Sequence, residues 1–347
     1  MRVTIRHSRA ADGTVPKMLR FGLLGSGLAA GFHAEALATM KDATLAGVTD
    51  RDYGRAVAFA EKYGAKSYSS LEAMLKDDKI DVVCVCTPSG FHADQAIEVL
   101  KSGKHAVLEK PMALTVEDAD RIIAAAEDSD KLLSVVFQNR FIPDVQKAKE
   151  IVDSGTLGKL VFCDLSMKYW RDPDYYASSD WRGTFKYDGG GALINQGIHG
   201  VDMLLYIVGE AKVRFAEVKT SYHNIETEDT AVAVLDFDNG ATGTLHASTC
   251  AYPGFNRRIE IIGTKGCIIM SEGRIEKLVI DGETKIDGTV EKRGASGDHT
   301  VMDTSFHAIQ LQNVVNAVEK GEKLFIDGKE GRRALKLIRD VYAFRGK

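Results

Sequence analysis

Two side chains far apart in the sequence could together move the proton that an alcohol loses when it is oxidised. Lys110 lies in the sequence Glu109-Lys110-Pro111, which directly follows the strand-like run 105–108. His199 lies in a segment that opens with three glycines at residues 189–191. A partly desolvated lysine has a lowered pKa and histidine titrates near neutral pH, so both types suit general acid–base catalysis. The alternative for Lys110 is a surface lysine opposite Glu109.

The chain also contains the pattern of a dinucleotide-binding loop. The apolar run 19–24 opens into a G-x-G-x-x-A sequence, Gly25-Ser26-Gly27-Leu28-Ala29-Ala30, with helical spacing after it. The first glycine permits a tight turn, the second lets a pyrophosphate approach the backbone, and the small third residue lets helix pack on strand. The helix N-terminus favours the negative phosphates. Strand, glycines and helix together predict a nicotinamide dinucleotide site.

Asp50 bears on which dinucleotide binds. It follows the second apolar run, residues 44–49, where a carboxylate would accept hydrogen bonds from the ribose hydroxyls and repel a 2′-phosphate. Asp50 therefore favours NAD. Arg51 follows it and could hold the 2′-phosphate of NADP, so that NADP stays open. The alternative for Asp50 is an ordinary turn residue at the end of a strand.

Up to about residue 140, short apolar runs alternate with segments whose apolar residues have the spacing of a helix. Strands are expected at residues 19–24, 44–49, 81–86, 105–108 and 132–138, with helices at 28–40, 54–63, 69–76, 91–102 and 116–128. This rhythm predicts an α/β domain with a doubly wound parallel (Rossmann) sheet. Lys110 would then lie at the carboxyl edge of the sheet, where ligands bind in such folds.

The pattern changes near Phe141-Ile142-Pro143, where the proline disfavours helix in the residue before it. Long alternating runs joined by turn sequences follow, among helices expected at 144–154, 201–208, 305–320 and 330–344. Strands are expected at 160–169, 213–222, 230–237, 240–249, 258–263, 267–271 and 277–280. The second part is thus predicted to be an α+β domain with a large, mostly antiparallel open sheet. The expected domains are 18–140 and 141–347, with residues 1–17 as a disordered extension.

Composition excludes several classes of protein. The net charge is -4, so there is no electrostatic basis for binding nucleic acid or an anionic membrane. No apolar run approaches the ~20 residues of a membrane-spanning helix. The five cysteines form no C-x-x-C pair, which indicates neither a metal site nor a disulfide framework and favours the reducing cytoplasm.

Three motifs in order carry a resemblance to a known family. The glycine loop, the sequence Glu109-Lys110-Pro111 and the segment 189–202 together resemble the glucose-fructose oxidoreductase, inositol dehydrogenase and MocA-like sugar dehydrogenases. The resemblance runs from about Met18 to the C-terminus. It implies NAD(P)-dependent hydride transfer between nicotinamide and a secondary hydroxyl of a sugar, sugar acid or cyclitol. Lys110 and His199 would handle the proton, and the Lys110–Pro111 peptide would be cis.

The resemblance also implies a set of cofactor contacts. Thr87 and Pro88 would line the dinucleotide, and Gln138 would lie near the nicotinamide. His92 would start the next helix, a structural role that we prefer to a catalytic one. The expected cofactor residues are Gly25, Ser26, Gly27, Leu28, Ala29, Asp50, Arg51, Thr87, Pro88, His92, Glu109, Lys110 and Gln138.

Asn195 departs from the family pattern, because many members carry aspartate four residues before the histidine. Asparagine can orient the ring or bind a sugar hydroxyl, but it has no charge to stabilise an imidazolium. The Asn-x-Gly-x-His pattern occurs in members that act on nucleotide-linked sugar acids, which hints at the substrate. In a regular helix Asn195, His199 and Asp202 would share one face.

Aromatic and arginine residues precede this helix. Rings can stack on the C–H groups of a sugar, and a guanidinium can hold a carboxylate or phosphate. The alternative is an ordinary loop or a subunit contact. The expected substrate residues are Lys110, Tyr169, Arg171, Trp181, Arg182, Asn195 and His199.

Two other functions stay open at this point. One is an enzyme that keeps its cofactor bound and uses it transiently, for epimerisation or elimination. The other is a non-catalytic, cofactor-binding sugar sensor, against which Lys110 and His199 argue. The exposed face of a large antiparallel sheet commonly needs cover, so we expect a homodimer or homotetramer.

Overall fold

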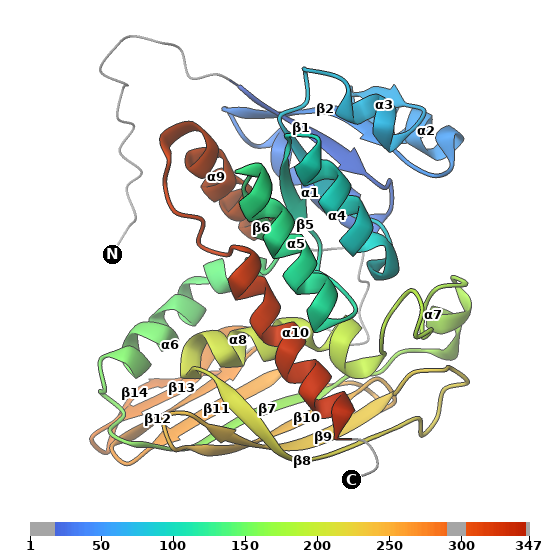
Figure 1. Cartoon of the computed structure of the whole chain (residues 1–347). Coiled ribbons are helices and arrows are strands. Elements are labelled where there is room, and N and C mark those ends of the chain that lie inside the picture. The colour runs from blue at the N-terminus through green and yellow to red at the C-terminus, as the bar shows by residue number, and fades with distance from the viewer. Residues whose placement is uncertain (1–17, 290–302, 345–347) are drawn as a thin grey trace.

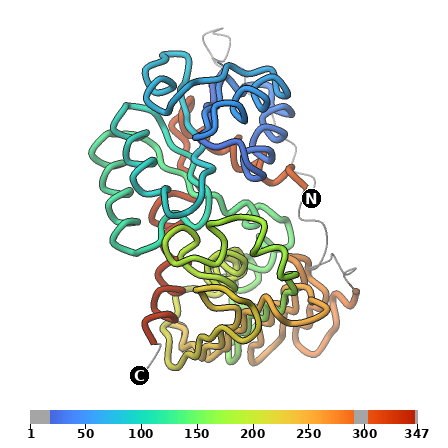
Figure 2. Tube along the Cα trace, turned by 90° about the vertical axis from the view of Figure 1, so that its right-hand side faces the viewer, coloured from blue at the N-terminus to red at the C-terminus, as the bar shows by residue number. Residues whose placement is uncertain are grey.

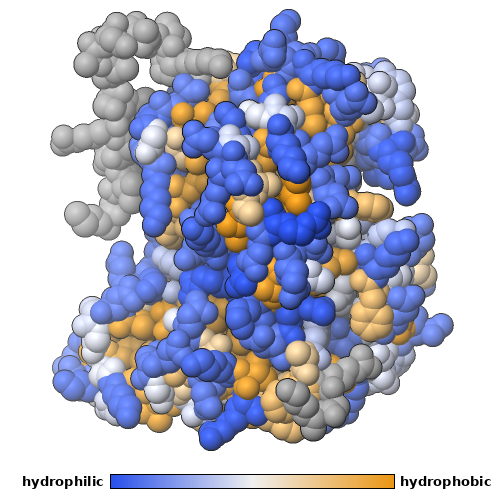
Figure 3. Space-filling model, viewed as in Figure 1, coloured by the Kyte–Doolittle hydropathy of each residue, from blue (hydrophilic) through white to orange (hydrophobic). Residues whose placement is uncertain are grey.

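The computed structural model describes residues 18–289 and 303–344, and two sheets organise them (Figure 1). The extension expected at residues 1–17 lies outside the described residues. Hydrophilic side chains cover much of the face drawn in Figure 3. Within the described ranges, no helix combines the length and apolar character that crossing a membrane requires.

The first sheet has six parallel strands in the order β3-β2-β1-β4-β5-β6. This order confirms the predicted doubly wound sheet. Strands β1, β4 and β5 are almost wholly buried, as expected for apolar runs covered on both faces. The strands are β1 (Leu19–Leu24), β2 (Ala43–Thr49), β3 (Lys66–Tyr68), β4 (Val82–Val85), β5 (His105–Leu108) and β6 (Leu133–Val135).

Helices cover both faces of this sheet, and local signals set their ends. The Asp52 side chain accepts hydrogen bonds from two backbone N–H groups at the start of α2, and Gly64 ends that helix in the left-handed conformation. Thr115 caps α5 in the same way as Asp52 caps α2. The helices are α1 (Leu28–Ala38), α2 (Tyr53–Tyr63), α3 (Leu71–Leu75), α4 (His92–Lys101) and α5 (Val116–Ser129).

The second sheet has eight strands in the order β14-β13-β12-β11-β7-β10-β9-β8. Only the central pair β7–β10 is parallel, so the prediction of a mostly antiparallel sheet is confirmed. Buried and less buried residues alternate along β9 and β10, because one face of the sheet meets helices. The strands are β7 (Leu160–Lys168), β8 (Ala211–Lys219), β9 (Thr230–Phe237), β10 (Thr242–Ser248), β11 (Arg258–Gly263), β12 (Gly266–Ser271), β13 (Arg274–Ile280) and β14 (Glu283–Asp287).

Three helices lie on the same face of the second sheet, between it and the first sheet (Figure 1). They are α6 (Pro143–Asp153), α8 (Ile198–Val208) and α10 (Gly328–Ala343). The opposite face carries exposed apolar side chains. Phe162 on β7 lies opposite Ile262 on β11, and each is 39% exposed.

Helix α9 (Ser305–Lys320) returns to the first sheet and packs against α1. Figure 2 shows this red segment beside the blue N-terminal elements. Leu311, Val314 and Val315 of α9 belong to the hydrophobic core around β1. A single division at residue 140 therefore does not describe the packing, since part of 141–347 completes the first core.

Candidate active site

A cleft of about 1220 Å³ lies between the two sheets. All thirteen expected cofactor residues line it, from the glycine loop at Gly25 to Gln138. Five expected substrate residues also line it, namely Lys110, Trp181, Arg182, Asn195 and His199. Tyr169 and Arg171 are buried, and the lining of the cleft does not include them.

The glycine loop has the geometry that a pyrophosphate requires. Gly25 has φ +102°, and an added Cβ would lie 2.8 Å from the carbonyl oxygen of Cys86, so only glycine fits there. Nothing lies within 4 Å of a Cβ added at Gly27, so the loop is open to a ligand at that point. No side chain caps the N-terminus of α1, which leaves its N–H groups for phosphate oxygens. The loop therefore fits a dinucleotide.

Asp50 presents a carboxylate beside this loop. The Ser26 N–H and hydroxyl donate to one of its oxygens at 2.8 and 2.7 Å, and the Asp52 N–H donates to the other at 3.0 Å. Burial opposes ionisation, but these hydrogen bonds hold the pKa of Asp50 below its usual value. The carboxylate is thus charged at the cleft, where the ribose of NAD would meet it. Arg51 lines the same cleft.

Glu109 and Lys110 directly follow β5, at the carboxyl edge of the sheet. Glu109 forms a buried ion pair with His33 at 2.8 Å, which overrides the effect of burial and lowers the pKa of Glu109 to about 2. Burial is the main cause that lowers the pKa of Lys110. The Lys110 ammonium donates to the carbonyl oxygen of Asn195 at 3.0 Å. The Lys110–Pro111 peptide is cis, as the resemblance implied.

His199 lies at the start of α8 and packs edge-on against the ring of Phe137, with ring centres 5.8 Å apart. Burial, followed by the charge of Lys110, lowers the pKa of His199 well below its usual value. The imidazole is therefore neutral at pH 7 and can accept a proton. Its Nδ1 atom is buried and makes no hydrogen bond within the described part of the chain.

The helix expected to carry Asn195, His199 and Asp202 on one face is not regular. Residues Ala192–Gln196 form a π-helical turn, and α8 begins only after Gly197. Glu228 imposes this turn by accepting hydrogen bonds from the Gly191 and Leu193 N–H groups at 2.9 and 2.8 Å. Asn195 and His199 both line the cleft, whereas Asp202 does not and pairs with Arg140 instead.

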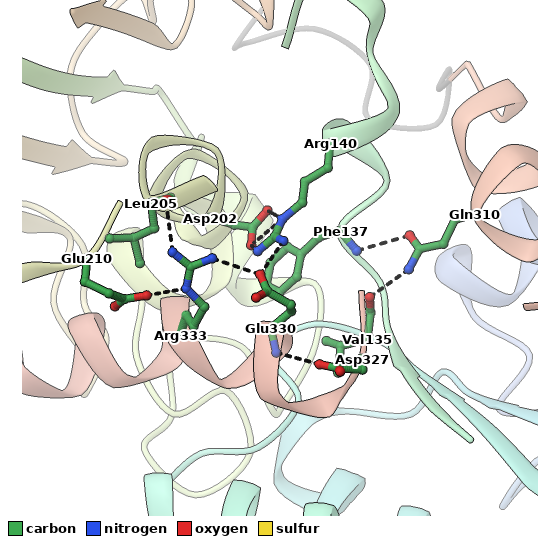
Figure 4. Close-up of polar contacts among 10 residues, drawn as sticks. All are labelled: Val135, Phe137, Arg140, Asp202, Leu205, Glu210, Gln310, Asp327, Glu330 and Arg333. Carbon is green, nitrogen blue, oxygen red and sulfur yellow. Dashed lines mark hydrogen bonds and ion pairs between the residues drawn. The ribbon is translucent and has the colours of Figure 1, made fainter. Parts of the chain in front are cut away.

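Asp202 instead joins an ion cluster that holds the two parts of the molecule together (Figure 4). Arg140 donates to Asp202 through Nε at 2.9 Å and through Nη2 at 2.6 Å, and to Glu330 of α10 at 2.6 Å. Arg333 also donates to Glu330, at 2.8 Å. Arg140 lies two residues after Gln138, while Asp202 lies three residues after His199. The cluster thus fixes the helix of His199 relative to the first sheet.

Other anchors hold the cofactor side of the cleft. His92 lies within hydrogen-bond distance of the Pro111 and Thr87 carbonyl oxygens, at 2.7 and 2.8 Å. These contacts fit the structural role that we preferred for His92. Gln310 of α9 accepts from the Phe137 N–H at 3.2 Å and donates to the Val135 carbonyl at 2.7 Å (Figure 4).

An arginine pair surrounds Tyr175 at the substrate end of the cleft. The Arg182 guanidinium lies 4.3 Å from the centre of the Tyr175 ring, and that of Arg171 lies 5.5 Å from it. Arg171 donates to the side-chain Oε1 atom of Gln196 at 2.7 Å, and the Gln196 Nε2 atom donates to the Tyr175 hydroxyl at 2.7 Å. Arg171 therefore supports the cleft from behind Gln196.

Sequence reasoning missed several residues of the cleft. Tyr175 and Gln196 stand inside segments that were expected to matter, but nothing in their spacing singles them out. His307 lines the cleft from α9, and its ring lies 5.7 Å from that of His33. No pattern in the sequence indicates that His307 lies in the same cleft as the glycine loop at residues 25–27. Among the described residues, no group of three or more His, Cys, Asp or Glu side chains could hold a metal ion.

Two family models match the chain. Residues 19–137 match the oxidoreductase family with an NAD-binding Rossmann fold, and residues 145–269 match the GFO/IDH/MocA C-terminal domain. The chain belongs to the GFO/IDH/MocA family. It therefore carries the NAD-binding domain of an oxidoreductase, and the glycine loop and Asp50 fit that cofactor.

Individual GFO/IDH/MocA proteins align over most of the chain. Myo-inositol 2-dehydrogenase of Thermotoga maritima is 31% identical over 92% of this chain and 94% of its own length. D-glucoside 3-dehydrogenase of Escherichia coli is 32% identical over 66% of this chain and 70% of its own length. The WlbA dehydrogenase of Bordetella pertussis, solved with NADH and UDP-GlcNAcA, is 31% identical, with a TM-score of 0.85 over 94% of this chain and 96% of its own.

Proposed function

We propose that this oxidoreductase uses NAD to oxidise a secondary hydroxyl of a sugar-type substrate, with Lys110 and His199 handling the proton. One observation carries the proposal. Lys110, at the edge of the NAD-binding sheet, contacts the backbone of Asn195 at 3.0 Å, one turn before His199. The first and second sheets thus each bring one acid–base group to the same cleft.

The electrostatics support this division of work. When bound, NAD supplies the hydride acceptor. Burial favours the neutral amine of Lys110 and the neutral imidazole of His199, and either neutral group can take the hydroxyl proton. Glu109 keeps its negative charge beside Lys110, which limits the fall in the pKa of that lysine. The retention of both groups weighs against a non-catalytic sensor.

We further propose that the substrate is anionic, as a sugar acid or a nucleotide-linked sugar acid is. Arg182 lines the cleft, and within the described residues its guanidinium donates to the Tyr175 carbonyl oxygen and the Ser178 hydroxyl, not to a carboxylate. A carboxylate or phosphate would complete such a site with charge-assisted hydrogen bonds. The UDP-GlcNAcA bound to the Bordetella pertussis protein supports this class, and the D-glucoside and inositol relatives are the neutral alternatives.

The test is a substrate panel followed at the absorbance of reduced nicotinamide. Inositols, glucosides, free sugar acids and UDP-linked sugar acids are each offered with NAD and, separately, with NADP. We expect turnover with an acidic sugar and NAD. Arg182→Ala should raise the KM of that acid at least tenfold and change the KM of a neutral sugar little. If NAD copurifies with the protein and is reduced by a substrate without being released, the result would favour the alternative of an epimerase or an eliminating enzyme.

We also propose a homodimer or homotetramer that acts in the cytoplasm. The exposed apolar residues Phe162 and Ile262 on the open face of the second sheet support assembly through that face. The five cysteines are free thiols, which supports a reducing compartment. Light scattering of the purified protein tests the assembly, and Phe162→Asp should lower the mass if this face is the interface.

A further inference from the structure

Asp188 is a buried carboxyl that the proposed proton chemistry does not use. It precedes the three glycines, is 1% exposed, and connects two parts of the substrate site. The Gly183 N–H, next to Arg182, donates to Oδ2 at 2.8 Å. The side-chain amide of Asn195 donates to Oδ1 at 2.5 Å. Burying a carboxyl group costs free energy, so we looked for a function that these two hydrogen bonds could serve.

The pairing decides which end of the Asn195 amide faces the cleft. Only the NH2 end of an amide can donate to a carboxylate, so the Asn195 Oδ1 atom must turn away from Asp188. Within residues 18–289 and 303–344, that oxygen accepts only a long hydrogen bond, from the Gln196 side-chain amide at 3.5 Å. Asn195 lines the cleft, and its backbone carbonyl accepts from Lys110. A hydrogen-bond acceptor is thus held beside the catalytic lysine.

We propose that Asp188 is a positioning residue that holds Asn195 as an acceptor for a substrate hydroxyl. The inference rests on the proposed function, since the hydroxyl belongs to its substrate. An aspartate at position 195 would present a carboxylate oxygen instead. In this protein the carboxyl group is that of Asp188, which binds the Asn195 amide, and the neutral amide presents its oxygen to the cleft. An acceptor that cannot rotate discriminates against substrates that lack the hydroxyl.

The charges around Asp188 set the conditions for a test. Burial and Glu228 raise the pKa of Asp188 to about 7, against the opposite effects of Gly183, Asn195 and Lys110. The experiment is therefore run at pH 8.5, where the carboxyl is ionised. Asn195→Asp alone would place two carboxyls in contact, and one of them would then retain a proton.

An exchange of the two side chains tests the pairing. The parent, Asp188→Asn, Asn195→Asp and the double variant are compared by kcat/KM for the best substrate of the panel. Each single variant should lower kcat/KM roughly tenfold or more, mainly through KM, the scale of one lost hydrogen bond to a charged group. The double variant should return to within about threefold of the parent, because amide and carboxyl again pair and an oxygen again faces the cleft.

Three controls separate this role from mere stabilisation. The dissociation constant of NAD should stay unchanged in all four proteins. A deoxy analogue that lacks the bound hydroxyl should be oxidised equally well by the parent and by Asp188→Asn. Asp174→Asn, an exposed change in the short helix α7 (Pro173–Ala177), should leave kcat/KM unchanged.

The outcomes are distinct. An active parent with an equally active Asp188→Asn variant overturns this inference alone. A double variant no better than the worse single variant, or one that does not fold, also overturns it. If Asp188→Asn fails to fold, the kcat/KM of the double variant is compared with that of Asn195→Asp. A double variant no better than Asn195→Asp then overturns the inference. A parent without turnover on any member of the panel overturns the proposed function and this inference together.

Discussion

Arg140 and Asp202 form a two-pronged ion pair in which both side chains are 1% exposed. The pair joins the segment that leaves the first sheet to α8, the helix that carries His199. Arg140 reaches Glu330 as well, so three elements meet at one guanidinium. Geometry of this kind constrains where the imidazole can lie relative to the nicotinamide.

Arg140→Ala should destabilise the protein by about 3–5 kcal/mol, because it leaves Asp202 buried without its cation. Urea unfolding at pH 8 measures the loss. Burial already raises the pKa of Asp202, so the loss should be smaller at pH 5, where the carboxyl can take up a proton. Lys336→Ala, which breaks an exposed pair with Asp340 on α10, should cost at most about 0.5 kcal/mol. Equal losses in the two variants would contradict this account.

Lys110→Ala and His199→Ala should each lower kcat by roughly 10²-fold or more, the usual scale for a positioned acid or base. The affinity for NAD should change much less, since the glycine loop and Asp50 hold the other end of the cofactor. The double variant should be little worse than the worse single variant, because the two groups act as a unit. Steady-state rates and NAD binding measure the two effects. Near-full turnover of Lys110→Ala would refute the assignment.

The rate of oxidation should rise with pH through the pKa of Lys110. Burial lowers this pKa from its usual value near 10.5, so the neutral amine forms at a lower pH than in an exposed lysine. A pH profile of kcat/KM should therefore show a rise that ends below pH 10.5. Lys110→Arg, which stays protonated throughout, should lack the rise and most of the activity. A profile that is flat in the parent would count against a titrating lysine.

Asp50→Ala should weaken NAD binding about tenfold, since two hydrogen bonds to the ribose are lost. The preference for NAD over NADP should fall at the same time, because the repulsion of a 2′-phosphate disappears. Arg51→Ala is the matched variant, and it should reduce NADP binding only. Fluorescence titration of the parent and the two variants with both cofactors measures the six dissociation constants. Tighter NADP than NAD binding in the parent would mean that Arg51 governs this end of the cleft.

Asp188 should make the stability of the protein depend on pH. Its pKa rises from about 4 in the unfolded chain to about 7 in the folded protein, so the folded state binds more protons between these values. The contribution of Asp188 is full below pH 4 and is lost as the pH rises through 7. Asp188→Asn lacks this dependence, and its free energy of unfolding relative to the parent should increase from pH 4 to pH 8. Urea unfolding over this range would show no such trend if the carboxyl were unperturbed.

Much of the fold could be predicted because its signals are local. The strand at 82–85 is wholly apolar and the strand at 105–108 is apolar after His105, as a parallel sheet covered on both faces requires. Strand β3 has three residues and β14 is mostly exposed, so neither shows an apolar pattern. These two strands could be found only from their neighbours in the sheets.

The site could be predicted only in part, for a related reason. The residues of the glycine loop and Lys110 follow strands, and their place at the sheet edge follows from the topology. The π-helical turn depends on Glu228, more than 30 residues later, and a spacing argument could not anticipate that contact. Asp188 reads as a polar residue before a glycine turn, and only the tertiary structure buries it.

Helix α9 has a consequence for how the protein is made. The ribosome has synthesised all six strands of the first sheet once it has passed residue 135, but the helix that covers α1 lies at residues 305–320. Until then α1 can pack on β2, but the part of it that contacts α9 has no permanent partner and is a natural site for a chaperone. The cofactor-binding half thus matures late, together with the half that recognises substrate. A product whose translation stops between the first sheet and α9 would leave the part of this core that α9 covers exposed to water.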